Sequence, residues 1–196
     1  MSAARRRVGL LGGSFDPPHE GHLWMARQAF KEAALAELWF MPACKPPHKL
    51  SRALSPYEDR LAMTELLAQE ESFLSVCRIE ESLPLPGYSI RTIQALKEQH
   101  PQTDFVFIIG EDSLATLEGW KDPDAIFAEV EVFVLAREGF ETDSSRPCQI
   151  LRSDFHPAQS RLIRDEITES GSSEHLTAPV SQFVKTRGLY REGKPS

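Results

Sequence analysis

Two histidines three residues apart, His19 and His22, follow a glycine pair within GLLGGSFDPPHEGHL, residues 9–23. If residues 8–11 form a strand and a helix begins near Gly21, both imidazoles lie on one side of its first turn. The free N–H groups and positive dipole end of such a helix favour an anion. Glycines in the turn after the strand let the backbone approach a ligand closely. The segment predicts a phosphate site, with a tight turn and exposed cap histidines as the alternative.

This turn lacks the fingerprint of a dinucleotide-binding dehydrogenase. That fingerprint is GxGxxG after a strand, whereas residues 9–14 spell GLLGGS. An NAD-dependent oxidoreductase is therefore a poor fit, although a nucleotide phosphate is not.

The elements that must position this segment alternate along the chain. Apolar runs predict strands, and amphipathic stretches predict helices. The predicted strands are 8–11, 38–41, 73–77, 105–109, 130–135 and, more weakly, 150–152; the predicted helices are 23–35, 57–68, 90–98, 124–127, 160–167 and 178–186. Alternation of this kind is typical of a doubly wound, Rossmann-like α/β fold, with a mainly parallel sheet and helices on both faces. Ligands of such a fold bind beyond the carboxyl ends of the strands.

Length and composition limit the function classes. The 196 residues, 41% hydrophobic, predict a single domain over 1–196, with a helical part at about 156–190 and a frayed tail at 191–196. The net charge of −7 makes nucleic acid an unfavourable partner. The three cysteines form no CxxC pair, which disfavours disulfides and zinc and favours the cytoplasm. No apolar run approaches the roughly 18 residues of a membrane helix.

The segment GGSFDPPHEGHL resembles the phosphate-binding signature of the nucleotidyltransferase superfamily, whose core His-x-Gly-His stands here at 19–22. Within it, the narrower pattern GG-[ST]-FDP resembles the corresponding pattern of the nicotinate-nucleotide adenylyltransferase family. Similar segments run as far as Tyr190: PPHK (46–49), YEDRLAM (57–63), GYSIRT (87–92), FIIGEDSL (107–114) with Trp120 after it, and residues 180–190. Two positions depart from the family pattern, namely Arg161 for a threonine and Arg91 for an acidic residue.

This resemblance implies transfer of the adenylyl group of ATP to nicotinate mononucleotide by direct in-line attack, in NAD biosynthesis. The implied catalytic residues are His22 on the α-phosphate, His19 beside it and Arg164 on the β- and γ-phosphates. The implied ATP contacts are Gly12, Gly13, Ser14, Phe15, His19, His22, Gly110, Asp112, Ser160 and Arg164. The implied pyridine-nucleotide contacts are Lys49, Tyr88, Ser89 and Trp120. Mg²⁺ is expected to come with ATP, and the sequence shows no dedicated metal cage.

Several alternatives stay open at this point. Ser160 is equally suited to cap a helix. Asp112 could also cap one, although the resemblance favours a ribose contact, and Trp120 could pack in the core. The acceptor could be nicotinamide mononucleotide or phosphopantetheine, since both use the same phosphate chemistry. A non-catalytic nucleotide sensor is a further alternative, favoured by Arg161. The oligomeric state is left open.

Overall fold

A six-stranded sheet forms the centre of the computed structural model, which describes residues 5–46, 54–137, 146–153 and 156–191. Its strands are β1 (Arg6–Gly13), β2 (Glu37–Pro42), β3 (Leu74–Val76), β4 (Thr103–Gly110), β5 (Glu131–Arg137) and β6 (Gln149–Ser153). The strand order is β3-β2-β1-β4-β5-β6, and every neighbouring pair is parallel. The predicted Rossmann-like sheet is confirmed, with each predicted strand present.

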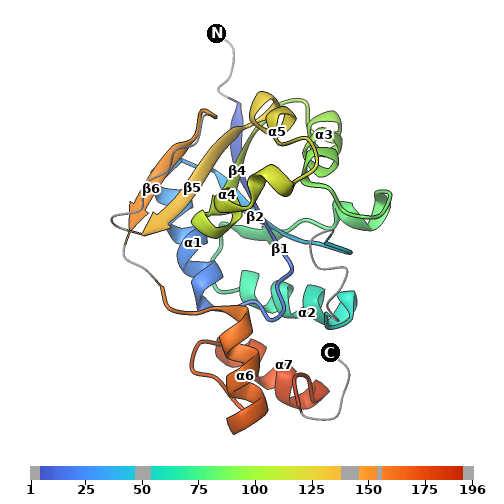
Figure 1. Ribbon diagram of the computed structural model, residues 1–196, viewed down its shortest axis with the longest axis vertical. Helices are drawn as coiled ribbons and strands as arrows, with labels where there is room; N and C mark the ends of the chain where they lie inside the picture. Colours follow the sequence, from blue (N-terminus) through green and yellow to red (C-terminus); the bar gives the residue numbers. More distant parts are fainter. Residues whose placement is uncertain (1–4, 47–53, 138–145, 154–155, 192–196) are drawn as a thin grey trace.

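Helices follow β1, β2, β3, β4 and β6 along the chain, as the alternating pattern predicts (Figure 1). They are α1 (Glu20–Glu32), α2 (Tyr57–Ala68), α3 (Ser89–Gln99), α4 (Glu111–Ala115), α5 (Pro123–Glu129), α6 (Ser160–Ser170) and α7 (Ala178–Arg187), with 3₁₀ turns η2 (Ile79–Ser82) and η3 (Leu117–Gly119). In Figure 1, α6 and α7 lie together at the end of the molecule opposite the N-terminus. The division of the chain into domain parts stays a prediction.

Two cores form because successive residues of a strand point to opposite faces of the sheet. Leu11 of β1 packs in a core with residues of α1, α2, α6 and α7. Its neighbour Leu10 packs in the other core, with residues of α3 and α5. Strands buried on both faces therefore appear in the sequence as the continuous apolar runs of a doubly wound fold.

The observed boundaries correct two predictions around β1 and α1. The helix predicted to reach residue 35 ends at Glu32, because Ala34 adopts a left-handed φ of 49°. The glycines predicted to form the turn, Gly12 and Gly13, instead end β1, where Gly13 is in register with Pro42 of β2. Pairing with β2 thus extends β1 beyond its apolar run.

A methyl group added at Gly9 should lower stability, because the core leaves no room for it. A Cβ on Gly9 would lie 2.5 Å from Leu35 Cδ1 and 2.8 Å from Ile108 Cδ1. We expect Gly9→Ala to lower the free energy of unfolding, measured in urea, by about 1–3 kcal/mol. Gly119→Ala is the control, since a Cβ there meets nothing within 4 Å. An unchanged urea midpoint for Gly9→Ala would contradict this packing.

Candidate active site

Two adjoining cavities open where the parallel strands end. The first, of about 150 Å³, is lined by His19, Gly21 and His156 and by residues at the ends of β4 and β5. The second, of about 360 Å³, is lined by the end of β1, the start of α3 and Trp120. Four residues line both cavities: His22, Met25, Gly110 and Asp112. A molecule in one cavity would therefore meet a molecule in the other beside His22.

The ring of His22 is held by its neighbours. Its Nδ1 accepts a hydrogen bond from the backbone N–H of His19 at 3.2 Å. A neutral imidazole with an accepting Nδ1 carries its proton on Nε2, so Nε2 is the donor. The ring of Phe15 lies against the imidazole, with 4.7 Å between ring centroids. The site thus contains a hydrogen-bond donor whose tautomer and position are set before any ligand arrives.

His19 occupies the N-cap position of α1 and is buried, not exposed as the alternative supposed. Its ring centroid lies 3.9 Å from that of His22. Burial, together with nearby His22, His156 and His175, holds the pKa of His19 well below its usual value. His19 is therefore neutral at neutral pH. Its Nδ1 has no hydrogen-bond partner among the described residues.

Gly21 is required by the His19 ring and by the chain that leads into α6. A Cβ at this position would lie 2.9 Å from His19 Nδ1 and 3.1 Å from the carbonyl oxygen of Ala158. These distances are shorter than ordinary van der Waals contact, so a larger residue would displace the His19 ring or the chain before α6. The glycine in His-x-Gly-His is thus explained by packing within the chain.

Helix N-termini point at both cavities. The N-cap residues of α1 and α6, His19 and Gln159, both line the first cavity. The N-cap residue of α3, Tyr88, lines the second cavity together with Ser89. Because the first N–H groups of a helix and its dipole favour negative charge, both cavities suit anionic groups.

The second cavity gathers residues predicted for two different substrates. Gly12, Gly13 and Ser14 line it, together with Tyr88, Ser89 and Trp120. Trp120 also packs edge-on against Phe107, so the same ring contacts the core and lines the cavity. The guanidinium of Arg91 lies over the Tyr88 ring, 5.1 Å from its centroid. A cation over an aromatic face stabilises that ring's position, which gives Arg91 a physical role here.

Three of the predicted residues in the described part of the chain line neither of these cavities. Phe15 is buried behind His22. Ser160 Oγ donates to the Pro17 carbonyl at 3.0 Å, and Arg164 Nη1 donates to the Asp16 carbonyl. The start of α6 thus holds the backbone that precedes His19. Contacts of these three residues with ATP stay predictions.

The two capping alternatives are wrong. The N-cap of α6 is Gln159, which leaves Ser160 as the first helical residue, and the N-cap of α4 is Gly110, not Asp112. Lys49 lies outside the described residues.

Buried charged residues support the site, and the sequence analysis missed them. Asp16 accepts a hydrogen bond from the Tyr190 hydroxyl at 2.7 Å, which ties the loop before His19 to the chain that follows α7. Arg60 of α2 is only 1% exposed. It stands in helical register with buried Thr64 and Leu67, a spacing that could have identified it as an inward-facing cation.

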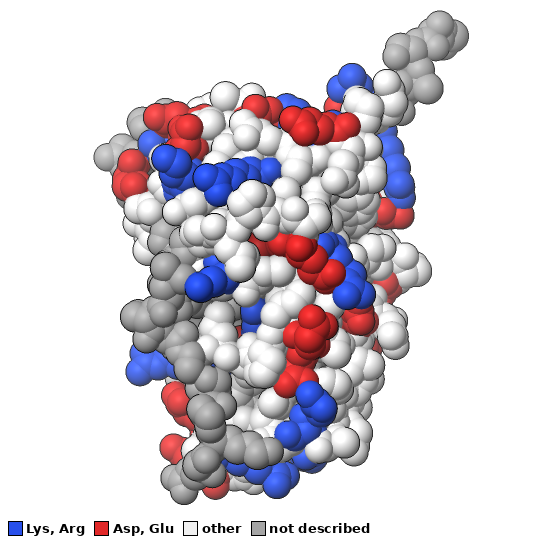
Figure 2. Space-filling model, turned by 90° about the vertical axis from the view of Figure 1, so that its right-hand side faces the viewer, with Lys and Arg blue, Asp and Glu red and all other residues white. Residues whose placement is uncertain are grey.

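The described residues set limits on other kinds of site. Among them, no three or more His, Cys, Asp or Glu side chains gather as a possible metal site. None of the helices in that part of the chain is long and apolar enough to cross a membrane. On the face drawn in Figure 2, basic and acidic side chains are interleaved and form no continuous basic surface.

Comparisons with known proteins show similar sequences and a similar fold. Residues 10–176 match the family model described as cytidylyltransferase-like. A protein of Bacillus cereus (strain Q1) named "Probable nicotinate-nucleotide adenylyltransferase" is 34% identical over 186 residues, or 94% of this chain and 98% of the relative. One of the same name from Halalkalibacterium halodurans is 36% identical over 190 residues, or 95% and 92%. Plasmodium falciparum nicotinic acid mononucleotide adenylyltransferase complexed with NaAD has a similar fold, with a TM-score of 0.77 at 17% identity over 94% of this chain and 97% of that chain.

Buried His19 should make stability depend on pH. Because its pKa lies well below the usual 6.5, the unfolded chain gains a proton near pH 6.5 that the folded chain does not. The free energy of unfolding should therefore fall below about pH 6.5, by up to about 1.4 kcal/mol per pH unit for this group. Urea unfolding at about pH 7.5 and about pH 5.5 measures the loss. His19→Asn should reduce it, and an equal loss in parent and variant would contradict a neutral His19.

Proposed function

Because the chain belongs to the cytidylyltransferase-like family, and within it to the nicotinate-nucleotide adenylyltransferases, we propose that it transfers the adenylyl group of ATP to nicotinate mononucleotide. The products are nicotinate adenine dinucleotide and pyrophosphate, which places the reaction in NAD biosynthesis. The observation that carries the proposal is the position of His22 on the wall shared by two anion-favouring cavities. Two phosphorylated substrates in these cavities would have their phosphates side by side at its ring.

ATP occupies the first cavity in this proposal. The ends of β4 and β5 receive the adenosine, and Asp112, an exposed carboxylate on both cavities, accepts hydrogen bonds from ribose hydroxyls. A Cβ on Gly110 would approach only Met25 Cε, at an ordinary 3.7 Å, so packing within the chain does not demand this glycine. The space instead suits a ligand. The phosphates then face the N-termini of α1 and α6.

Nicotinate mononucleotide occupies the second cavity. Trp120 and Tyr88 offer aromatic faces for the pyridine ring. In α3, the N–H groups of Arg91 and Thr92 already donate to the Tyr88 carbonyl, which leaves the donors at the very start of the helix directed outward. Those donors match a carboxylate, which only accepts hydrogen bonds. A nicotinamide would bring its own N–H groups to them, so the acid is favoured over the amide.

The chain contributes positioning and charge stabilisation to the transfer. A phosphate oxygen of nicotinate mononucleotide attacks the α-phosphorus in line, and the bond to the pyrophosphate oxygen breaks. His22 Nε2–H donates to a non-bridging α-phosphate oxygen, where negative charge increases in the transition state. Neutral His19 keeps the His22 ring in place by packing. Mg²⁺ that arrives with ATP supplies charge neutralisation on the phosphates. Arg164 is predicted to act on the β- and γ-phosphates.

An acceptor assay tests the proposed function. Purified protein is given ATP with Mg²⁺ and, separately, nicotinate mononucleotide, nicotinamide mononucleotide or phosphopantetheine, and pyrophosphate release is measured. We expect kcat/KM for the acid to exceed that for the amide by at least about tenfold, because the amide leaves helix donors unpaired. Equal or faster turnover of phosphopantetheine would overturn the proposal. ATP binding without pyrophosphate release for any acceptor would identify a nucleotide sensor.

Loss of the shared imidazole should affect the chemical step. We expect His22→Ala to lower kcat by about 100-fold or more, as removal of one transition-state donor does. Its thermal unfolding should stay close to that of the parent, since His22 is only partly buried. The matched control is His100→Ala, which removes an imidazole that packs on Trp39 near the start of β4. A loss under about tenfold for His22→Ala would contradict its role.

A further inference from the structure

A buried carboxylate joins the two walls of the second cavity. Glu80, in η2, is 8% exposed and lines that cavity. Its Oε2 accepts a hydrogen bond from the Cys44 backbone N–H at 3.0 Å, and its Oε1 accepts one from the Thr92 hydroxyl at 3.2 Å. Cys44 follows β2, and Thr92 lies in the first turns of α3. One side chain therefore bridges the chain after β2 to the helix whose N-terminus faces the ligand.

The segment before α3 is fitted closely around this carboxylate. A Cβ on Gly87 would overlap the Glu80 carboxylate, so only glycine leaves room for it. The Gly87 N–H also donates to the Lys45 carbonyl at 3.2 Å, a second link between the same two walls. Because Gly87 directly precedes Tyr88, the Glu80 carboxylate determines where the N-cap of α3 can lie.

Arg60 holds the other side of the segment after β2. Its guanidinium donates to the carbonyls of Ala43 at 2.8 Å, Cys44 at 3.2 Å and Ser14 at 2.7 Å. Glu80 binds the N–H of Cys44 while Arg60 binds the carbonyl of Ala43, so the peptide unit between these two residues is fixed from both sides. Burial raises the pKa of Glu80, whereas its two hydrogen bonds and Arg60 favour the charged form.

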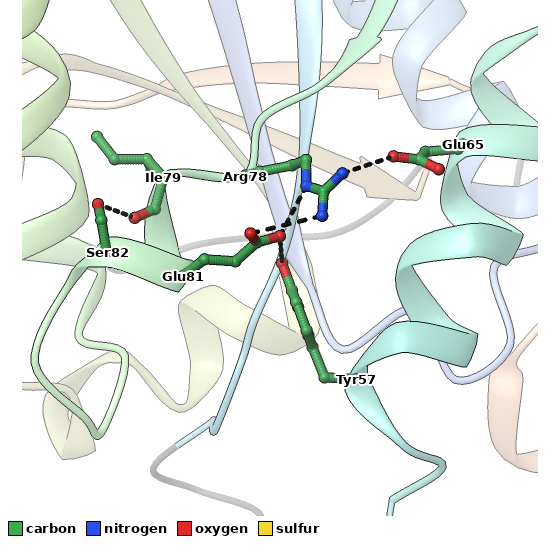
Figure 3. A network of polar contacts seen from close by, with 6 residues as sticks. All are labelled: Tyr57, Glu65, Arg78, Ile79, Glu81 and Ser82. Atoms are coloured by element: carbon green, nitrogen blue, oxygen red, sulfur yellow. Dashed lines mark hydrogen bonds and ion pairs between the residues drawn. The ribbon is translucent and has the colours of Figure 1, made fainter.

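A second set of contacts fastens η2 to α2 (Figure 3). Glu81 accepts hydrogen bonds from the Tyr57 hydroxyl at 3.2 Å and from Arg78 Nε at 2.7 Å. Arg78 also forms an ion pair with Glu65 at 3.7 Å. Glu81 is exposed and does not line the second cavity, so adjacent glutamates of one turn face opposite environments. Glu81 is therefore a matched comparison for Glu80.

We propose that Glu80 is a positioning residue for the acceptor nucleotide. By bridging Cys44 and Thr92 it sets the separation of the two walls and the placement of the α3 N-terminus, on which the acceptor's carboxylate would bind. This inference rests on the proposed function. Glu80, Cys44 and Thr92 do not line the first cavity, so the placement of ATP does not depend on the bridge.

Steady-state kinetics, measured with the concentrations of both substrates varied, distinguish a positioning role of Glu80 from a general effect on the structure. We expect Glu80→Ala to raise KM for nicotinate mononucleotide about tenfold or more while KM for ATP changes less than about twofold, because small displacements of a binding group cost this much. Glu80→Gln should stay within about threefold of the parent, since its Oε1 can accept from Cys44 N–H and its Nε2 can donate to Thr92 Oγ1. Glu81→Ala should leave both KM values within about twofold.

Each other outcome overturns the proposal. Equal rises of both KM values for Glu80→Ala would indicate loss of general structure. A Glu80→Gln variant as impaired as Glu80→Ala would show that the negative charge acts, for example on the pyridinium ring, and not the bridge. If Glu80→Ala does not fold, Thr92→Val removes one of the two bonds, and an unchanged KM for the acceptor then refutes the bridge.

The acceptor preference of the parent enzyme distinguishes failure of the Glu80 inference from failure of the proposed function. If the parent turns over nicotinate mononucleotide and Glu80→Ala matches it, only the Glu80 inference fails. If the parent prefers another acceptor, the proposed function fails, and the same comparison of KM values is made with the acceptor that it uses.

Discussion

The hydrogen bond from the His19 backbone N–H to His22 Nδ1 is the interaction on which the rest of the site depends. It exists because His19, at the N-cap of α1, adopts an extended conformation with φ of −154°, which turns its N–H toward the first helical turn. The same geometry buries the His19 ring and brings it against Gly21, where no side chain fits. The spacing of the motif thus leaves room for the His19 ring and fixes the tautomer of His22. As a result, His22 presents one oriented hydrogen-bond donor to both cavities.

Strand order determines where that donor stands. β1 and β4 are neighbours at the centre of the sheet, and the helices that follow them pack on opposite faces, α1 in one core and α5 in the other. A crevice forms at such a switch point, because the two connections leave the sheet edge in opposite directions. Gly110 at the end of β4 and His22 in α1 border this crevice from its two sides and line both cavities. Two substrates can therefore meet there without either one crossing the sheet.

The sequence predicted the fold class, all six strands and the central histidine pair, because buried parallel strands and a glycine-histidine segment are local patterns. It missed α4 and η2, which are too short for a helical period to show. It also missed Arg60 and Glu80, for a different physical reason. Apart from the Thr92 hydroxyl on Glu80, their partners are backbone groups of Ser14, Ala43 and Cys44, brought near by folding, and backbone groups carry no residue-type signal. Gly12 and Gly13 were misplaced because pairing with β2, which extends β1, is a long-range effect.

A chain with a net charge of −7 can still receive phosphates because the attraction is local. Basic residues such as Arg5 and Arg7 are paired with Asp104 and Glu131 near the start of the strands, at the edge of the sheet away from the cavities. At the cavities the favourable groups are helix N-termini and the imidazoles of His19 and His22, with Lys121 on the second. Helix dipoles act only within about the first turn, so their benefit depends on where each helix begins. Side chains that bind no ligand but fix those starting points, as the Glu80 bridge does for α3, are then as much a part of recognition as the groups that face the substrate.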